Sequence, residues 1–478
     1  MNILLIKPPL SPNLLTVSLY EPLELEYLAS SVRNHNIRIL DMRIDRNLIK
    51  ELIRFRPDLV GITAYTCDYN ITVQVLKEIK KYNRGIRTVV GGNHATFLPL
   101  DFVLPEVDAI FTGYADFTFP GYINDFDNPE KLKEIPNIVL IENGNFFITK
   151  KVSSATDLNA LPLPDRYLIK KYQNKYHDPA RNKLTLLMTS RGCPFRCNFC
   201  ACWKLMGGKF ATRNAESIIC ELKSLPENID VVYFSDDNTF CNINRMWEIS
   251  HLIRENNIHK KLHMYARADT IVSHPDLFRE LKNAGLHFIT IGLESFQNKD
   301  LDNYNKKTTV SINNRAIQIL KETGIYILAH FIVRPEYTKE DFKMLHEYVV
   351  NKNLFRPAFP VLTPLPGTEL YENTLGSFEI TNFDFFDFVH SILPTKLPAK
   401  EFYNQMATLY SNSYSVGRYL KYLKNRLFFQ NSENNATKNT DGINLGKLIL
   451  MYFFSKGMVK KLRNFYLVNE NIKLKSQL

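Results

Sequence analysis

The stretch Met188-Thr-Ser-Arg-Gly-Cys-Pro-Phe-Arg-Cys-Asn-Phe-Cys200 follows directly on an apolar, strand-like run, Leu184 to Met188. It places Cys193, Cys197 and Cys200 in a C-x3-C-x2-C spacing. A cubane [4Fe-4S] cluster needs a ligand on each of its four irons, and thiolates are the usual protein ligands. Three thiolates on one short loop can therefore hold three irons and leave the fourth open to a small molecule. The spacing predicts a catalytic cluster rather than one that only carries electrons.

Two other interpretations of these cysteines exist. Cys202 follows closely, so a four-thiolate zinc site is one alternative, although structural zinc sites usually divide their ligands into two separated pairs and no second pair is nearby. Three unrelated thiols in a reduced protein are the other, because free cysteine is a common core residue. Only seven cysteines occur in 478 residues, and four of them fall within ten positions. This clustering favours the iron-sulfur interpretation.

With the aromatic Phe199 just before the last cysteine, the loop resembles the radical S-adenosylmethionine (SAM) superfamily. The resemblance implies that the open iron chelates the amino and carboxylate groups of SAM. It also implies that reductive cleavage of SAM yields a 5′-deoxyadenosyl radical, with electrons from an external reductant such as flavodoxin or ferredoxin.

Length and composition limit the class of protein. A chain of 478 residues predicts two or three domains, and 45% hydrophobic with 23% charged residues is typical of a soluble globular protein. The first residues do not resemble a signal peptide, and no apolar run reaches the roughly 18 to 20 residues of a spanning helix. The odd number of clustered cysteines argues against a disulfide scaffold, so we expect a cytoplasmic protein.

The net charge of +11 is concentrated after Ser411, where twelve Lys or Arg face three Asp or Glu. Apolar residues recur there at helical spacing. A basic amphipathic helix is typical of peripheral contact with an anionic membrane, here the inner face. The alternative is a pair of helices packed on the protein body with a solvated basic face. A basic patch cannot by itself distinguish polyanions, but no nucleic-acid partner is expected.

Residues 1–135 predict an α/β domain with a doubly wound parallel sheet, because strand-like and helical runs alternate. The predicted strands are 2–6, 37–40, 59–64, 87–90 and 109–111, and the predicted helices are 23–34, 48–55 and 72–82. Ligands bind such sheets beyond the carboxyl ends of the strands.

Small and hydroxyl residues at those strand ends allow close approach of a large ligand. The pattern Val89-Val-Gly-Gly-Asn-His-Ala-Thr96, followed by Val107-Asp-Ala-Ile-Phe-Thr-Gly113, resembles the cobalamin-binding domain of class B radical SAM enzymes. No Asp-x-His-x-x-Gly motif occurs, so histidine ligation of cobalt in that manner is not expected. A flavodoxin-like nucleotide module is the alternative. The candidate cobalamin contacts are Thr63, Gly91, Gly92, His94, Thr96 and Gly113.

A linker is expected over 136–180, and a second strand-helix series over 181–370 predicts a partial (β/α)6 barrel, followed by a helical region over 371–478. The strands of the barrel are expected at 184–188, 231–234, 261–266, 288–292, 326–333 and 358–362. Catalytic residues should collect at the ends of these strands.

Polar residues at those ends match the groups that SAM presents. By resemblance to radical SAM enzymes, Asp236 and Asp237 would bind the amino group, Arg267 would face the carboxylate, Glu294 would lie near the ribose, and Phe199 would lie against adenine. Each has a structural alternative, since an Asp-Asp-Asn turn is a frequent helix cap and an Arg-Glu pair needs no ligand. Arg334 adds a cation that either pairs with Glu336 or meets a phosphate.

The segments 359–367 and 383–398, with the cluster loop, are similar to the hopanoid C-3 methylase group. The resemblance implies a cobalamin-dependent methyl transfer to an unactivated carbon of a small, lipid-like isoprenoid. A radical SAM and cobalamin enzyme without net methylation, or a non-catalytic cobalamin sensor, are the alternatives.

Overall fold

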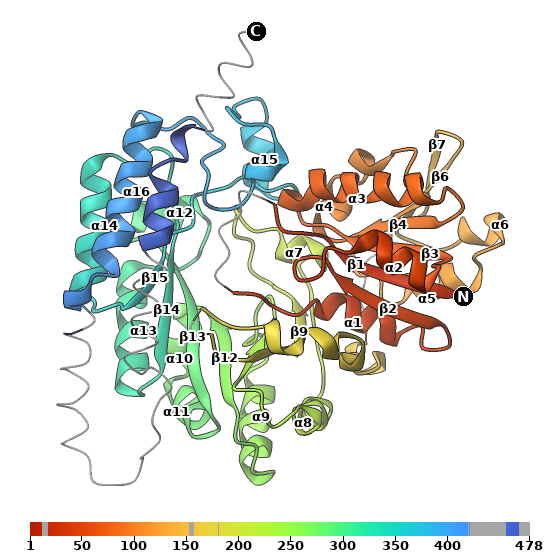
Figure 1. Ribbon diagram of the computed structural model, residues 1–478. Helices are drawn as coiled ribbons and strands as arrows, with labels where there is room; N and C mark the ends of the chain where they lie inside the picture. Colours follow the sequence, from red (N-terminus) through yellow and green to blue (C-terminus); the bar gives the residue numbers. More distant parts are fainter. Residues whose placement is uncertain (12–17, 153–156, 180, 419, 421–455, 468–478) are drawn as a thin grey trace.

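The computed structural model describes residues 1–478 except 12–17, 153–156, 180, 419, 421–455 and 468–478. An amino-terminal α/β domain lies beside a second, larger α/β domain, and the carboxyl-terminal helices pack on the second (Figure 1). None of the helices in the described part of the chain is long and apolar enough to cross a membrane.

The amino-terminal domain contains a seven-stranded sheet in the order β2-β1-β3-β4-β5-β6-β7, in which β1 to β5 are parallel. Separate apolar clusters cover its two faces, so the predicted doubly wound sheet is confirmed. Helix α1 is shorter than predicted, because residues 31–34 form a turn. The parallel strands are β1 (Asn2–Lys7), β2 (Asn36–Asp41), β3 (Leu59–Thr63), β4 (Arg87–Gly91) and β5 (Ala109–Phe111), and the helices are α1 (Leu23–Ser30), α2 (Leu48–Phe55), α3 (Tyr69–Tyr82), α4 (Asn93–Phe97), α5 (Thr118–Asn124) and α6 (Pro129–Leu132).

The sheet extends beyond residue 135, into the predicted linker. Strands β6 (Ile138–Glu142) and β7 (Asn145–Ile148) form an antiparallel hairpin that pairs with β5. Asn143 and Gly144 connect them with positive φ angles of 52° and 79°. Asn-Gly is the preferred sequence of a two-residue hairpin turn with two positive φ angles, so the sequence carried a hairpin signal that strand-helix alternation overlooked.

The second domain is built on a six-stranded parallel sheet in the order β15-β14-β13-β12-β11-β8. This confirms the predicted (β/α)6 architecture. The last strand begins two residues earlier than predicted and ends at Ala358, where only a single bridge, Val333 to Val361, continues the pairing. The strands are β8 (Leu184–Leu187), β11 (Val231–Phe234), β12 (Lys261–Ala266), β13 (Leu286–Glu294), β14 (Tyr326–Phe331) and β15 (Arg356–Ala358).

Helices cover one face of this sheet and bury a large apolar core against it. The helices are α8 (Ala215–Ser224), α9 (Ile243–Glu255), α10 (Ala268–Ser273), α11 (Pro275–Asn283), α12 (Asn298–Asn303), α13 (Val310–Glu322) and α14 (Lys339–Asn351). Strand residues alternate between two faces, so the other side chains of β11, β12 and β13 point to the opposite, concave side.

The described carboxyl-terminal region is largely helical, with α15 (Glu369–Thr374), a short turn η5 (Phe383–Phe385) and α16 (Ala399–Ser413). Residues 456–462 are helical, and Leu462 and Phe465 are buried in the barrel core. For these residues the structure follows the packed alternative with a solvated basic face. The rest of the predicted basic helices, within 421–455 and 468–478, lies outside the described residues.

The two domains are joined by packing and by buried ion pairs. Gly367, with a φ of +86°, lies so close to Phe97 of α4 that an added Cβ would be 2.3 Å from the ring. Arg166 pairs with Glu21, which precedes α1, and with Glu221 of α8 at 2.7 Å. The first domain thus contacts the second through α4 and through the segment before α1.

Candidate cofactor sites

The cysteine loop begins after the short strand β9 (Ser190–Gly192), which pairs with β10 (Phe210–Thr212), and ends in the helical turn α7 (Cys202–Leu205). Gly192 has a φ of +85°, and an added Cβ would lie 2.4 Å from the carbonyl oxygen of Lys209. Only glycine fits there without a shift of the backbone. The chain therefore turns sharply just before Cys193 and presents the three thiols from one loop.

The surroundings of the thiols suit thiolates. The amide of Asn238 donates to Cys193 Sγ at 3.7 Å. Burial raises the pKa of Cys193 and of Cys197, and the hydrogen bond from Asn238 and the positive charges of Lys306 and Arg267, respectively, oppose these shifts. A hydrogen bond from Cys202 lowers the pKa of Cys200. Donors and cations around sulfur stabilise the anionic form that binds metal, so the residues present fit an iron-sulfur cluster.

In the described part of the chain no three His, Cys, Asp or Glu side chains converge closely enough to hold a single metal ion. A cubane cluster does not need such convergence, because each thiolate ligates a different iron. The assignment of Cys193, Cys197 and Cys200 as ligands stays a prediction.

The two aspartates that follow β11 have different partners. Asp236 is 4% exposed, and its carboxylate accepts hydrogen bonds from Thr189 N at 2.6 Å, Thr189 Oγ1 at 2.5 Å and Ser190 N at 2.9 Å. Asp237 accepts from Gly192 N at 2.7 Å. Both carboxylates therefore hold the backbone that leads into the cysteine loop. Their predicted contact with the SAM amino group stays a prediction, and the three protein donors on Asp236 do not favour it.

Arg267 follows β12 and is already engaged by the protein. Its guanidinium lies 3.6 Å from the centre of the Phe195 ring in the cysteine loop. It also forms a forked contact with Asp269 and donates to Lys306 O at 2.7 Å. This arrangement makes Arg267 a support of the loop, and its predicted contact with the SAM carboxylate is untested.

Glu294 ends β13 with a φ of +60° and accepts from Lys306 Nζ at 2.7 Å. Lys306 is 8% exposed and lies close enough to Cys197 for their charges to interact. The sequence analysis missed Lys306, because it lies in a loop after α12 that carries no motif. Its position makes it a second cation beside the predicted SAM site.

Phe199 packs against Tyr304, with ring centroids 5.4 Å apart, in a small apolar cluster that includes Ile332 and Leu362. Apolar side chains thus surround Phe199 beside the cysteine loop, while the adenine contact is untested. Arg334 takes the ion-pair alternative, with Asp300 at 2.5 Å and Glu336 at 3.2 Å.

In the first domain, the structure brings the predicted cobalamin residues together at the carboxyl ends of β3, β4 and β5. Gly92 has a φ of +99°, and an added Cβ would lie 2.9 Å from Thr63 Oγ1. Thr96 Oγ1 donates to Gly92 O at 2.8 Å and accepts from Gly113 N at 2.9 Å. Gly91 leads directly into this turn at the end of β4. These residues form a tight turn of backbone and small side chains, here called the cradle, at the edge of the sheet where ligands bind in this kind of fold.

His94 does not belong to this cradle. Its side chain is completely buried, Nε2 lies 3.1 Å from Asp101 Oδ2, and its ring packs against Tyr69 and Phe383. Burial lowers its pKa. A neutral imidazole enclosed by aromatic rings has no surface to offer a ligand, so the structure argues against the predicted cobalamin contact through this side chain.

Comparison with known proteins identifies both domains. The sequence profile of the radical SAM superfamily matches residues 187–349, and that of the B12 binding domain matches residues 16–123. The chain therefore combines a B12-binding domain with a radical SAM domain, an arrangement whose cofactors are a [4Fe-4S] cluster, SAM and cobalamin, and methyltransferases are among its relatives.

Among its relatives is the hopanoid C-3 methylase of Methylococcus capsulatus, which is 26% identical over 400 residues, covering 81% of this chain and 75% of that protein. The anaerobic magnesium-protoporphyrin IX monomethyl ester cyclase of Rubrivivax gelatinosus is 25% identical over 387 residues, covering 78% of this chain and 68% of the cyclase. The fold is shared with the cobalamin-dependent radical SAM enzyme OxsB, solved with aqua-cobalamin and SAM bound. That similarity has a TM-score of 0.69 at 17% identity, over 97% of this chain and 80% of OxsB.

Proposed function

We propose that the enzyme methylates an unactivated carbon of a lipid-like isoprenoid related to hopanoids. The observation that carries the proposal is the direct contact between the two cofactor loops. Tyr114, next to the cradle residue Gly113, donates to Asp237, which holds the backbone nitrogen of Gly192 just before Cys193. A methyl donor and a radical generator must act on the same carbon, so their sites must face each other.

When bound, the cluster with SAM supplies a radical that removes hydrogen from carbon, and cobalamin supplies the methyl group. The protein holds and orients these groups and excludes water. Lys306 and Arg267 place positive charge beside Cys197. Asp236 and Asp237 hold β9 and the start of the cysteine loop in place. An external one-electron reductant such as flavodoxin or ferredoxin completes the proposed system.

The side chains on the concave face of the barrel sheet support the proposal of an apolar polycyclic substrate. These side chains include Tyr233, stacked at 5.5 Å on Tyr20 and lying 4.3 Å from His263. Tyr265 is 36% exposed, and its ring lies 5.5 Å from that of Tyr233. Burial, with Arg356 and His330 nearby, lowers the pKa of His263 to about 3. The aromatic side chains of this face favour an apolar ring system, and Arg356 beside Phe288 places one cation at its edge.

The test of this proposal is the mass of the product. Lipids extracted from cells with and without the gene should differ by species heavier by one methylene unit. The purified, reconstituted enzyme should produce the same species from the unmethylated lipid fraction and labelled SAM. If substrate disappears without incorporation of the label, methylation is the wrong reaction.

A reaction without net methyl transfer is the second candidate, because the cyclase of R. gelatinosus is similar over most of this chain. In that case the product would contain no methyl group from SAM, although 5′-deoxyadenosine would still form. A non-catalytic sensor would form neither product under a strong reductant.

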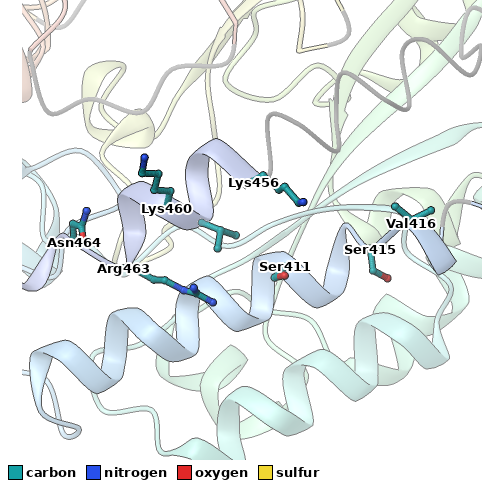
Figure 2. Close-up of a pocket in the computed structure, with 8 residues that line it drawn as sticks. Ser411, Ser415, Val416, Lys456, Lys460, Arg463 and Asn464 are labelled. Atoms are coloured by element: carbon teal, nitrogen blue, oxygen red, sulfur yellow. The ribbon is translucent and has the colours of Figure 1, made fainter.

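We also propose a peripheral contact with an anionic membrane through the carboxyl-terminal surface formed by residues 456–467 and the end of α16. A groove of about 740 Å³ lies between these elements, lined by Ser411, Ser415, Val416, Lys456, Val459, Lys460, Arg463 and Asn464. In Figure 2 the side chain of Arg463 lies between the segment and α16, whereas Lys460 points away from α16. Exposed Val416 and Leu467 add apolar surface to these cations. Basic charge with apolar side chains is the pattern of interfacial binding.

The membrane contact predicts that Lys460→Glu/Lys461→Glu weakens binding to vesicles containing anionic lipid by at least about tenfold, since each basic residue near such a surface contributes about 1 kcal/mol. Both lysines are exposed. Co-sedimentation with anionic and neutral vesicles measures the effect. Lys50→Glu/Lys77→Glu makes the same charge change on exposed helical positions of the first domain. Equal loss in both variants would mean that only net charge matters, and the contact would be refuted.

A further inference from the structure

The strongest contact between the two cofactor loops is a buried ion pair. Arg191, two residues before Cys193, donates to both carboxylate oxygens of Asp116, at 2.6 Å and 3.1 Å. The two residues are 7% and 8% exposed. Asp116 lies three residues after Gly113 of the cradle. A forked Arg-carboxylate pair fixes orientation as well as distance, so this pair sets how one loop sits on the other.

Tyr114 adds a second connection. Its ring lies under the Arg191 guanidinium, 4.3 Å from its centre. Its hydroxyl donates at 3.4 Å to Asp237 Oδ2, the same oxygen that accepts from Gly192 N at 2.7 Å. On the other side, Gly113 N donates to Thr96 Oγ1 at 2.9 Å. Hydrogen bonds and one peptide bond thus connect Thr96 of the cradle, through Gly113, Tyr114 and Asp237, to Gly192, the residue before Cys193.

We propose that Arg191, Asp116, Tyr114 and Asp237 form a positioning joint through which cobalamin binding and cluster binding strengthen each other. The inference rests on the cluster and cobalamin assignments above. If the joint is rigid, the first cofactor to bind orders both loops, and part of its binding free energy is used for this ordering. The second cofactor then binds to loops that are already ordered, so its affinity is higher. Coupling of this kind is reciprocal and typically amounts to a 5- to 150-fold change in affinity.

The alternative is that the pair only stabilises the packing of the domains. The two roles differ in one measurable quantity, the ratio of cobalamin dissociation constants in cluster-free and cluster-loaded protein. If the pair only stabilises domain packing, a variant that breaks it changes both dissociation constants by the same factor and leaves their ratio unchanged. If the pair is a joint, a variant that breaks it changes the ratio itself, because binding at one site no longer affects binding at the other.

The experiment titrates aqua-cobalamin into the full-length protein, prepared anaerobically with its cluster or stripped of it by a chelator, and follows absorbance. For wild type we expect the cluster-loaded form to bind cobalamin at least about fivefold more tightly. In Tyr114→Phe and Asp116→Asn we expect the ratio to fall to about one. Cluster content is measured in every sample by iron and sulfide.

Two further variants keep the outcome interpretable. Arg191→Met/Asp116→Leu removes both charges together, which avoids leaving one buried charge unpaired, and it should also give a ratio near one. Asn70→Ala removes two hydrogen bonds, from α3 to Asn382 and to Asp384, at another contact between the amino-terminal domain and the carboxyl-terminal region. This variant should keep the wild-type ratio.

A wild-type ratio of one, or variants that retain the wild-type ratio, would overturn the joint. If wild type takes up no cluster or no cobalamin at all, the proposed function fails instead. The two failures are therefore distinguishable within one set of titrations.

Discussion

Cys197→Ala is expected to reduce the formation of 5′-deoxyadenosine from SAM to background under a strong reductant. Cys197 is the most enclosed of the three loop thiols, 6% exposed and close to the charges of Lys306 and Arg267. Without it the cluster would lose one of its three predicted protein ligands, and an iron that loses its thiolate dissociates or takes a solvent ligand. Nucleoside product is quantified by chromatography after anaerobic reconstitution.

Cys220→Ala is the matched control. Cys220 lies on α8 and is exposed, so its removal deletes a thiol without touching the cysteine loop. It should leave iron content and SAM cleavage at wild-type values. SAM cleavage by Cys197→Ala at the wild-type rate would refute the ligand assignment, and a zinc content of one per chain in the wild type would favour the four-thiolate alternative.

The architecture could be predicted because strands and helices each have a local pattern of apolar and polar residues. The apolar runs of the parallel strands are bounded by turn residues and separated by helical stripes. The observed limits of two of them, Val231–Phe234 and Lys261–Ala266, match the predicted ones, whereas β13, β14 and β15 differ from the prediction by two to four residues at one or both ends. The β6 and β7 hairpin was missed, because its exposed strand Asn145–Ile148 shows none of the burial that marks the others. Periodicity reports burial, so an edge strand is the hardest to see.

The candidate sites could be predicted only where the functional residues are close together in the sequence or lie at equivalent strand ends. The three cysteines and the small residues at strand ends are visible because each set lies in one loop or at equivalent strand ends. Lys306 meets Glu294 across twelve residues, and Arg191 meets Asp116 across 75 residues. No local pattern encodes such pairs, since they depend on how loops fold back and how domains dock. His94, in contrast, was predicted as a cobalamin contact but is buried. A polar residue in a glycine-rich turn can still face the core.

The first domain supplies the second large effect. Gly92→Ala is expected to weaken cobalamin binding at least about tenfold, which corresponds to about 1.4 kcal/mol. Gly92 adopts φ 99° and ψ −175°, a region that is essentially restricted to glycine and costs other residues about 1–3 kcal/mol. An added Cβ would also lie 2.7 Å from both the nitrogen and the oxygen of Ala64. The backbone must shift, and Thr96, which is bonded to Gly92 O, must shift with it.

Gly144→Ala separates strain from damage to the cradle. Gly144 also has a positive φ, 79°, but an added Cβ there meets nothing within 4 Å, and it lies in the turn between β6 and β7. Both variants should lower the thermal midpoint, because both place alanine at a positive φ. Only Gly92→Ala should weaken cobalamin binding, measured by titration of the cluster-free protein so that the result is independent of the cysteine loop. If Gly92→Ala binds cobalamin as tightly as Gly144→Ala, the turn after β4 is not part of the cobalamin site, and the cofactor must be held by the other strand ends.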